Sequence, residues 1–135
     1  MRRIGITGGI GSGKSVVSRL LRIMGYSVYD TDSEAKRLME SSLEVVQKLS
    51  ECFGRDIYHN GRLNRGLLSS RVFGKSDKIV LLNSIVHPVV RFDFYRWSES
   101  LNEEICFVES AILYESRFDE LVDEVWTVTA PEELR

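Results

Sequence analysis

The stretch Gly8-Gly9-Ile10-Gly11-Ser12-Gly13-Lys14-Ser15 matches the pattern GxxxxGK[ST] at every fixed position. An apolar segment, residues 3–7, precedes it, and apolar residues at helical spacing follow it to Met24. Glycines allow successive backbone amides to point into one concavity, and the N-terminus of the following helix directs its positive dipole there. The pattern therefore predicts a phosphate-binding loop between a buried strand and a helix.

Each residue type in this loop suits one part of a nucleotide triphosphate. The Lys14 ammonium can reach the β- and γ-phosphates, and the Ser15 hydroxyl is placed to ligate Mg²⁺. A glycine-rich turn without a ligand is the simplest alternative, but the strand and the helix supply the context that a phosphate loop requires. We expect ATP to contact Gly9, Ile10, Gly11, Ser12, Gly13, Lys14, Ser15 and Val16.

Composition and charge argue against several classes of protein, among them nucleic-acid-binding and membrane proteins. The 135 residues carry a formal net charge of -2, which gives no overall attraction to nucleic acid or to an anionic membrane surface. No apolar run approaches the roughly 18 residues that a membrane-spanning helix needs. Cys52 and Cys106 lie far apart in the sequence, outside any metal-binding pattern, and are expected to be free thiols. We expect a cytoplasmic protein that binds neither nucleic acid nor membranes.

The rest of the chain alternates between strand and helix patterns. A short strand ends at Asp30-Thr31-Asp32, and Ser33 is a plausible N-cap for the helix that follows. Further helices are predicted over 43–53, 65–73, 79–87 and 89–101, the break falling at His87-Pro88 because proline disfavours helix at the residue before it. Buried-type strands are predicted over 105–108 and 125–128. This order is typical of an α/β protein with a parallel sheet.

Acidic residues follow two of these strands. Asp30 and Asp32 come directly after the second strand, and Glu109 ends the third. Ligands of open parallel sheets bind at the carboxyl ends of the strands, so a carboxylate there could accept a proton from an acceptor hydroxyl or hold Mg²⁺ through water. For the aspartates, capping of the next helix is the alternative. For Glu109, pairing with a nearby lysine competes with a metal role.

The ordered set of motifs resembles the dephospho-coenzyme A kinase family. Residues 6–15 are similar to that family's phosphate loop, and Val28-Tyr29-Asp30-Thr31-Asp32 is similar to its acidic motif. Leu63-Asn64-Arg65 resembles the start of one of its helices, and residues 82–88, Leu-Asn-Ser-Ile-Val-His-Pro, resemble a second segment. Residues 109–115 are similar to the stretch after the third strand, so the resemblance covers nearly the whole chain.

The resemblance implies a fold, a reaction and a set of roles. The fold would be a three-layer P-loop NTPase-type parallel sheet flanked by helices, with a helical substrate-binding insert at about 33–103 in one domain over 1–135. The reaction would transfer the γ-phosphate of ATP to the 3′-hydroxyl of dephospho-coenzyme A, the last step of coenzyme A synthesis. Asp32 would be the base and Lys14 the catalytic cation, Arg65 and His87 would bind the acceptor, and Ser15 would hold Mg²⁺, with Asp30 or Glu109 acting through water.

The sequence departs from the family in two places. Ala111 stands where the family usually has proline, and the chain ends at Arg135, whereas the family continues through an arginine-bearing lid, a further strand and a final helix. We therefore expect a C-terminally incomplete kinase domain that does not turn over alone, as a monomer or small homo-oligomer. Another P-loop nucleoside or metabolite kinase and a non-catalytic nucleotide-binding module are the alternatives. A purely structural α/β domain would require the phosphate loop to be accidental.

Overall fold

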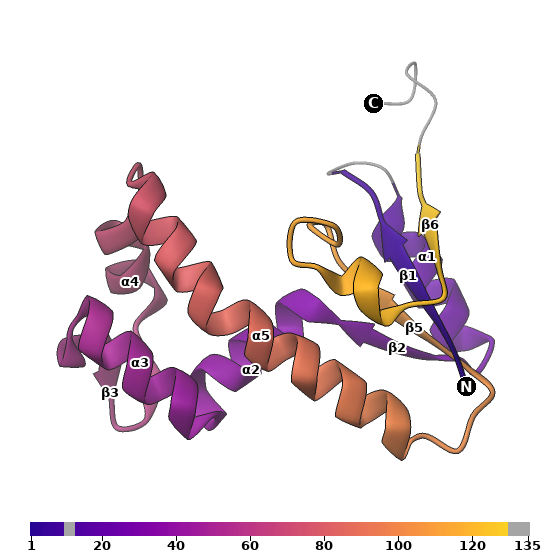
Figure 1. Ribbon diagram of the computed structural model, residues 1–135, viewed down its shortest axis with the longest axis horizontal. Coiled ribbons are helices and arrows are strands. Elements are labelled where there is room, and N and C mark those ends of the chain that lie inside the picture. Colours follow the sequence, from indigo (N-terminus) through magenta and orange to yellow (C-terminus); the bar gives the residue numbers. More distant parts are fainter. Residues whose placement is uncertain (10–12, 130–135) are drawn as a thin grey trace. The chain divides into compact units, whose positions relative to one another are not determined.

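A computed structural model of the chain describes residues 1–9 and 13–129 and separates into two compact units (Figure 1). The sheet unit consists of Met1–Asp32 and Arg91–Arg135, and the helical unit consists of Ser33–Val90. Within the described residues, no helix combines the length and the apolar character needed to cross a membrane.

The sheet unit is built on four parallel strands. These are β1 (Arg2–Thr7), β2 (Ser27–Asp30), β5 (Ile105–Glu109) and β6 (Glu124–Thr127), in the order β2-β5-β1-β6. Helix α1 (Lys14–Ile23) connects β1 to β2, and Figure 1 shows it beside the sheet. The predicted α/β class with a parallel sheet is therefore confirmed.

Side chains alternate between two faces of the sheet, as the period of a strand requires. On one face Ile4, Ile6 and Phe107 form a buried cluster with Leu21 of α1. On the other face the ring of Tyr29 lies 5.4 Å from the ring of Phe94, which belongs to the last helix before β5. The sheet therefore has helix packed on both faces, which makes the three layers expected from the sequence.

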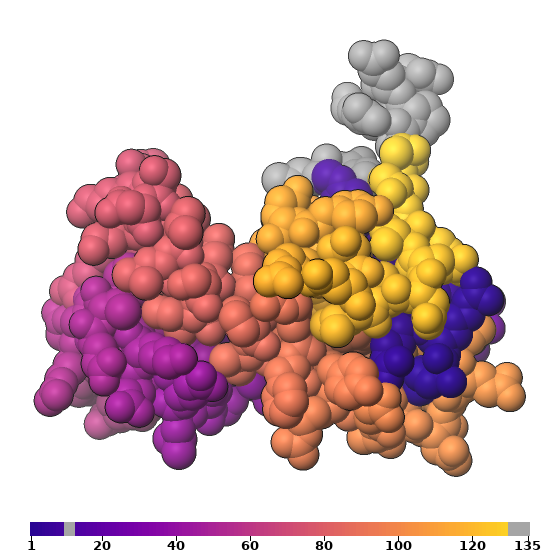
Figure 2. Space-filling view, viewed as in Figure 1, coloured from indigo at the N-terminus to yellow at the C-terminus, as the bar shows by residue number. Residues whose placement is uncertain are grey.

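A short turn of 3₁₀ helix, η2 (Phe118–Leu121), adds to this second layer. Phe118 is 1% exposed, and its ring lies 5.7 Å from the ring of Phe94. Figure 2 shows the gold segment that contains η2 against the orange C-terminal part of that helix. Together these aromatic side chains close the core of the sheet unit on the face opposite α1.

Helix α1 ends at Ile23, and Gly25, two residues later, adopts a left-handed φ of 96°. The Gly25 N–H donates to the Arg22 carbonyl and the Tyr26 N–H donates to the Leu21 carbonyl, both at 3.0 Å. These two bonds are a Schellman motif, in which a glycine without Cβ takes the left-handed position at little cost. The chain thereby turns from α1 directly into β2.

The helical unit consists of short helices around its own core. Its elements are α2 (Thr31–Ser41), which begins in the sheet unit, α3 (Leu43–Phe53), η1 (Arg55–Ile57), β3 (Tyr58–His59), β4 (Arg62–Leu63), α4 (Arg65–Val72) and the first part of α5 (Ser76–Ser100). Val45, Leu49 and Ile57 are all 0% exposed within it. The predicted helices at 43–53 and 65–73 are confirmed, and Asn64 is the N-cap of α4.

The antiparallel pair β3–β4 was not predicted, although the sequence carries a signal for it. Tyr58 pairs with Leu63, and the turn between the strands is Asn60-Gly61, with φ values of 50° and 79°. Two consecutive left-handed residues are the requirement of a type I′ hairpin, which Asn-Gly satisfies best. The strands are too short to show an alternating pattern, so only the dipeptide could have revealed them.

Two predicted helix boundaries are wrong. The helix break at His87-Pro88 does not occur, because α5 runs from Ser76 to Ser100 with Pro88 inside it. Val86, Val90, Phe94 and Ser98 are all buried at four-residue spacing, and this continuous packing outweighs the one hydrogen bond that proline cannot donate.

The other wrong boundary is the start of α2. This helix begins at Thr31 rather than after Ser33. The Asp30 carboxylate accepts a hydrogen bond from the Asp32 N–H at 3.1 Å, which is the contact made by an N-cap residue. Aspartate and serine are equally good N-cap residues, so residue type alone could not decide between Asp30 and Ser33.

Candidate active site

The predicted acidic residues meet at one edge of the sheet. Asp30, the last residue of β2, is the register partner of Glu109, the last residue of β5. Glu109 is also the register partner of Ile6 in β1, one residue before that strand ends. Because all these strands are parallel, their carboxyl ends lie together, at the edge where open α/β sheets bind ligands.

Lys14 points to this edge from the first residue of α1. Its Nζ lies 3.1 Å from the Glu109 Oε1, and the two side chains are only 15% and 8% exposed. Of the two roles open to Glu109, pairing with a lysine is therefore what the structure contains. An ammonium held at the start of a helix and balanced by one carboxylate is prepared to receive an anion.

Gly13, directly before Lys14, adopts a φ of 94°. This left-handed conformation is costly for a residue with a Cβ, which explains a glycine at the position where the loop becomes a helix. Ser15 and Val16 follow in the first turn of α1 and are exposed, as is Gly9 at the start of the loop. The predicted ATP contacts Ile10, Gly11 and Ser12 lie outside the described residues.

The two aspartates at the end of β2 have different surroundings: one carboxylate faces solvent, and the other accepts a hydrogen bond from the backbone of the next helix. Asp30 caps α2 through the Asp32 N–H, as the capping alternative proposed, while the Asp32 side chain is exposed. Between them Thr31 is buried, and its hydroxyl donates to the Glu109 carbonyl at 2.8 Å. Asp32 is thus attached, through its neighbour, to the same residue that binds Lys14.

Thr31 is the residue that the sequence reasoning missed. It lies inside the quoted acidic motif, but only the carboxylates on either side were given roles. A β-branched hydroxyl residue in a run of charged ones was the available signal, because such a side chain can be buried if its hydroxyl finds an acceptor.

The two predicted acceptor-binding residues belong to the helical unit. Arg65 is the first residue of α4, is exposed, and donates through its guanidinium to the Lys36 carbonyl at 3.3 Å. His87 is half-buried inside α5, so it is not the helix-end residue that the sequence suggested. Lys14, Glu109 and Asp32, by contrast, all belong to the sheet unit.

Neither cysteine takes part in this site. Cys106 lies in β5 and is 0% exposed, and burial raises the pKa of its thiol to about 11. A thiol with so high a pKa stays protonated and unreactive at neutral pH. Both cysteines are free, as expected, and Cys52 is the exposed one.

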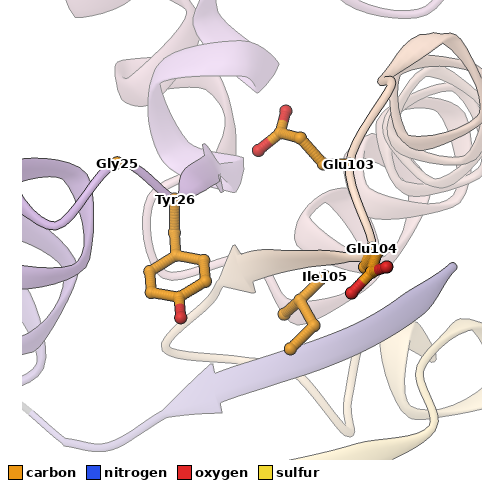
Figure 3. Close-up of a pocket in the computed structure, with 5 residues that line it drawn as sticks. All are labelled: Gly25, Tyr26, Glu103, Glu104 and Ile105. Carbon is orange, nitrogen blue, oxygen red and sulfur yellow. The ribbon is translucent and has the colours of Figure 1, made fainter.

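A depression of about 290 Å³ lies at the opposite edge of the sheet (Figure 3). Its lining is drawn in the figure and comes from the turn after α1 and the segment entering β5: Gly25, Tyr26, Glu103, Glu104 and Ile105. These residues lie at the amino ends of β2 and β5, whereas Lys14, Glu109 and Asp32 lie at the carboxyl ends of the strands. The depression is therefore separate from the candidate active site.

The chain is similar to known proteins over nearly its whole length. The sequence model of the dephospho-CoA kinase family matches residues 2–135. The chain belongs to this family. A dephospho-CoA kinase from Porphyromonas gingivalis is 48% identical over 135 residues, which is 100% of this chain and 67% of that protein. A dephospho-CoA kinase from Corynebacterium diphtheriae is 42% identical over 139 residues, covering 100% of this chain and 70% of its own length.

Solved structures share the fold of this chain. A crystal structure of a protein from Thermus thermophilus has a TM-score of 0.79 at 35% identity, covering 98% of this chain and 68% of that one. A dephospho-CoA kinase from Campylobacter jejuni has a TM-score of 0.66 at 16% identity, which shows the fold alone. The chain spans about two thirds of the length of its curated family relatives, 67% and 65% for the relatives from P. gingivalis and Bacteroides fragilis.

Proposed function

We propose that the protein phosphorylates the 3′-hydroxyl of dephospho-coenzyme A with ATP, giving coenzyme A and ADP. The observation that carries this proposal is the placement of Lys14, Glu109 and Asp32 at one edge of the sheet, in a chain that belongs to the dephospho-CoA kinase family. Phosphoryl transfer has a loose transition state, so positioning and charge neutralisation supply most of the catalysis. In the sheet unit, Asp32 would position the acceptor hydroxyl and Lys14 would neutralise phosphate charge.

The phosphates of ATP would be held by the loop after β1. The Lys14 ammonium would exchange its contact with Glu109 for the β- and γ-phosphate oxygens, and the backbone amides at the start of α1 would add their dipoles. Gly9, Gly13, Ser15 and Val16 would line the same loop together with Ile10, Gly11 and Ser12. Lys14 is the residue that we expect to stabilise charge on the transferring group.

Asp32 is proposed as the base. Its exposed carboxylate follows the end of β2, on the sheet edge where the nucleotide would lie. There it would accept the proton of the acceptor hydroxyl while that oxygen attacks the γ-phosphorus, and ADP would leave from the opposite side. Asp30 is less suited to this role because its carboxylate caps α2.

The acceptor would be bound with the help of Arg65 and His87 of the helical unit. The Arg65 guanidinium is exposed and can bind a phosphate through two parallel hydrogen bonds. The proposed partners are therefore ATP and dephospho-coenzyme A, with no nucleic acid and no membrane. We further propose a cytoplasmic protein that acts as a monomer or small homo-oligomer.

The donors at the sheet edge fit Mg²⁺. Ser15 offers a hydroxyl, and Asp30 and Glu109 offer carboxylates at paired positions of neighbouring strands. Mg²⁺ prefers such oxygen ligands and commonly takes only one or two from the protein, the rest being water and phosphate. Ser15 would hold the ion directly, Asp30 or Glu109 would act through water, and the bound ion would neutralise phosphate charge.

The deciding experiment measures ADP release from ATP and Mg²⁺ with and without dephospho-coenzyme A. It uses this chain and a chimera in which the C-terminal third of the P. gingivalis relative follows Arg135. Asp32→Asn in the chimera should lower turnover by at least about a hundredfold with little change in ATP affinity. Asp119→Asn changes an exposed aspartate of η2 in the same way and should have no effect.

The outcomes separate the proposed reaction from its alternatives. Acceptor-dependent release in the chimera supports it, whereas release with another nucleoside or metabolite only would indicate a different P-loop kinase. ATP binding without turnover on any acceptor would indicate a non-catalytic nucleotide-binding module. An Asp32→Asn chimera with full activity would remove Asp32 as the base.

A further inference from the structure

The starting observation is the buried hydroxyl of Thr31. This residue begins α2, directly after β2 ends at Asp30, and is 7% exposed. Its Oγ1 donates a hydrogen bond of 2.8 Å to the carbonyl oxygen of Glu109. The bond joins two segments that are 78 residues apart in the sequence, at the strand ends that form the candidate active site.

Glu109 is engaged at both its backbone and its side chain. Its carbonyl accepts from Thr31, and its carboxylate binds the Lys14 ammonium at 3.1 Å. On the other side of Thr31, the Asp32 N–H donates to the Asp30 carboxylate at 3.1 Å. A short series of contacts therefore runs from the proposed base, through Thr31 and Glu109, to the lysine that would hold the phosphates.

We propose that Thr31 is a positioning residue that fixes Asp32 relative to Lys14. This inference rests on the proposed function, because it matters for catalysis only if Asp32 and Lys14 act on the same reacting groups. A misplacement of about 1 Å can cost a hundredfold in rate, so a base in the first turn of a helix needs such an attachment. The hydroxyl provides it, whereas the methyl group of the same side chain only fills space.

A substitution can separate these two contributions. Thr31→Val keeps the shape and the β-branch but removes the donor, whereas Thr31→Ser keeps the donor and loses the methyl group. If the hydroxyl positions Asp32, the valine variant is impaired and the serine variant is close to wild type. If Thr31 only packs, the valine variant is harmless and the serine variant is the impaired one. For the exchange measurement, Thr127→Val, an exposed threonine of β6, is the matched control.

The first measurement is backbone amide hydrogen exchange by NMR on this 135-residue chain, which needs no turnover. In Thr31→Val the Asp32 amide should exchange about tenfold faster, the effect expected from one lost hydrogen bond. The amides of Ile6 and Val108, inside the sheet, should keep their wild-type rates, and Thr31→Ser should restore the Asp32 rate. An unchanged Asp32 rate, or equal acceleration throughout the sheet, would overturn the proposal.

The second measurement is acceptor-dependent turnover in the chimera described above. Thr31→Val should lower kcat by about tenfold or more and leave the KM for ATP within about twofold, since the Thr31 hydroxyl donates to the Glu109 carbonyl rather than to Lys14. Equal kcat values for the valine variant and the wild type would overturn the catalytic part of the proposal. If the wild-type chimera itself does not turn over, the proposed function fails, while the exchange rates still decide whether Thr31 holds Asp32.

Discussion

Lys14 and Glu109 form an enclosed ion pair, with Nζ and Oε1 3.1 Å apart and side chains only 15% and 8% exposed. The pair joins the first residue of α1 to the last residue of β5, across 95 positions of sequence. Without a nucleotide, Glu109 is the group that balances the lysine charge. Phosphates would offer the same lysine a second partner, so the stability of the chain and its binding of nucleotide should be linked.

Glu109→Gln should therefore be destabilising in the absence of nucleotide and less so in its presence. The loss should be roughly 2 kcal/mol in the free energy of unfolding, since a nearly buried ammonium loses its counter-charge. ATP added without Mg²⁺ supplies negative charge to Lys14 and should raise the melting temperature of the variant more than that of the wild type. Equal increases in the melting temperatures of the variant and the wild type would contradict the idea that Glu109 and the phosphates compete for Lys14.

The control for this variant is Glu99→Gln. Glu99 pairs with Arg3 and is 55% exposed, so the same chemical change should cost less than about 1 kcal/mol. Its melting temperature should respond to ATP as the wild type does, because neither residue of that pair lies at the carboxyl ends of the strands.

Removal of the N-cap of α4 should weaken the helical unit. The Asn64 Oδ1 accepts from the Leu67 N–H at 3.0 Å, so Asn64→Ala should lower the free energy of unfolding by about 1 kcal/mol in urea titrations. Ser42→Ala removes the cap of α3, where the corresponding distance is 3.4 Å, and should cost less. Ser69→Ala, at an exposed position inside α4, should be nearly neutral. A larger loss for Ser42→Ala than for Asn64→Ala would contradict this order.

Tyr58 should make stability depend on alkaline pH. Its hydroxyl donates to the Met39 carbonyl at 2.6 Å, and burial together with the nearby Glu40 raises its pKa from 10.0 to about 12. A folded pKa above the unfolded value favours the folded state fully below about pH 10, and this contribution is lost as the pH rises toward 12.

Tyr58→Phe removes this titration and one hydrogen bond. It should be about 1 kcal/mol less stable than the wild type at neutral pH, and the difference should narrow as the pH rises above 10, in urea unfolding at a series of pH values. Tyr114→Phe, at an exposed position, keeps Tyr58 and should follow the wild-type pH profile. A difference that stays constant with pH would show that Tyr58 is not the titrating group.

The two thiols should react at very different rates. Near pH 8 a disulfide reagent should modify one thiol of the native chain rapidly, because Cys52 is exposed, and the second only on unfolding. Burial and the pKa of about 11 both protect Cys106. Cys52→Ser should abolish the rapid phase. A rapid phase that persists in this variant would mean that the sheet opens at β5.

The sequence alone carries the phosphate-loop motif and predicts the four strands of the parallel sheet in their order along the chain. The spacing of Gly8, Gly13 and Lys14 is local, as are the caps at Gly25 and Asn64, so each could be recognised from a few neighbouring residues. The same holds for the Asn60-Gly61 turn, whose signal was present although the hairpin was not predicted. Local conformational preference decides features of this kind.

Only the tertiary structure decided which partners the polar residues found. Glu109 could have held a metal or a lysine, and Asp30 could have faced solvent or capped a helix; parallel pairing of β1, β2 and β5 placed Lys14 and Thr31 against Glu109. The continuity of α5 through Pro88 was also settled by packing, since its buried stripe outweighs a local preference to break. Contacts between distant segments depend on how the strands pair and the helices pack, which the pattern within any one segment does not specify.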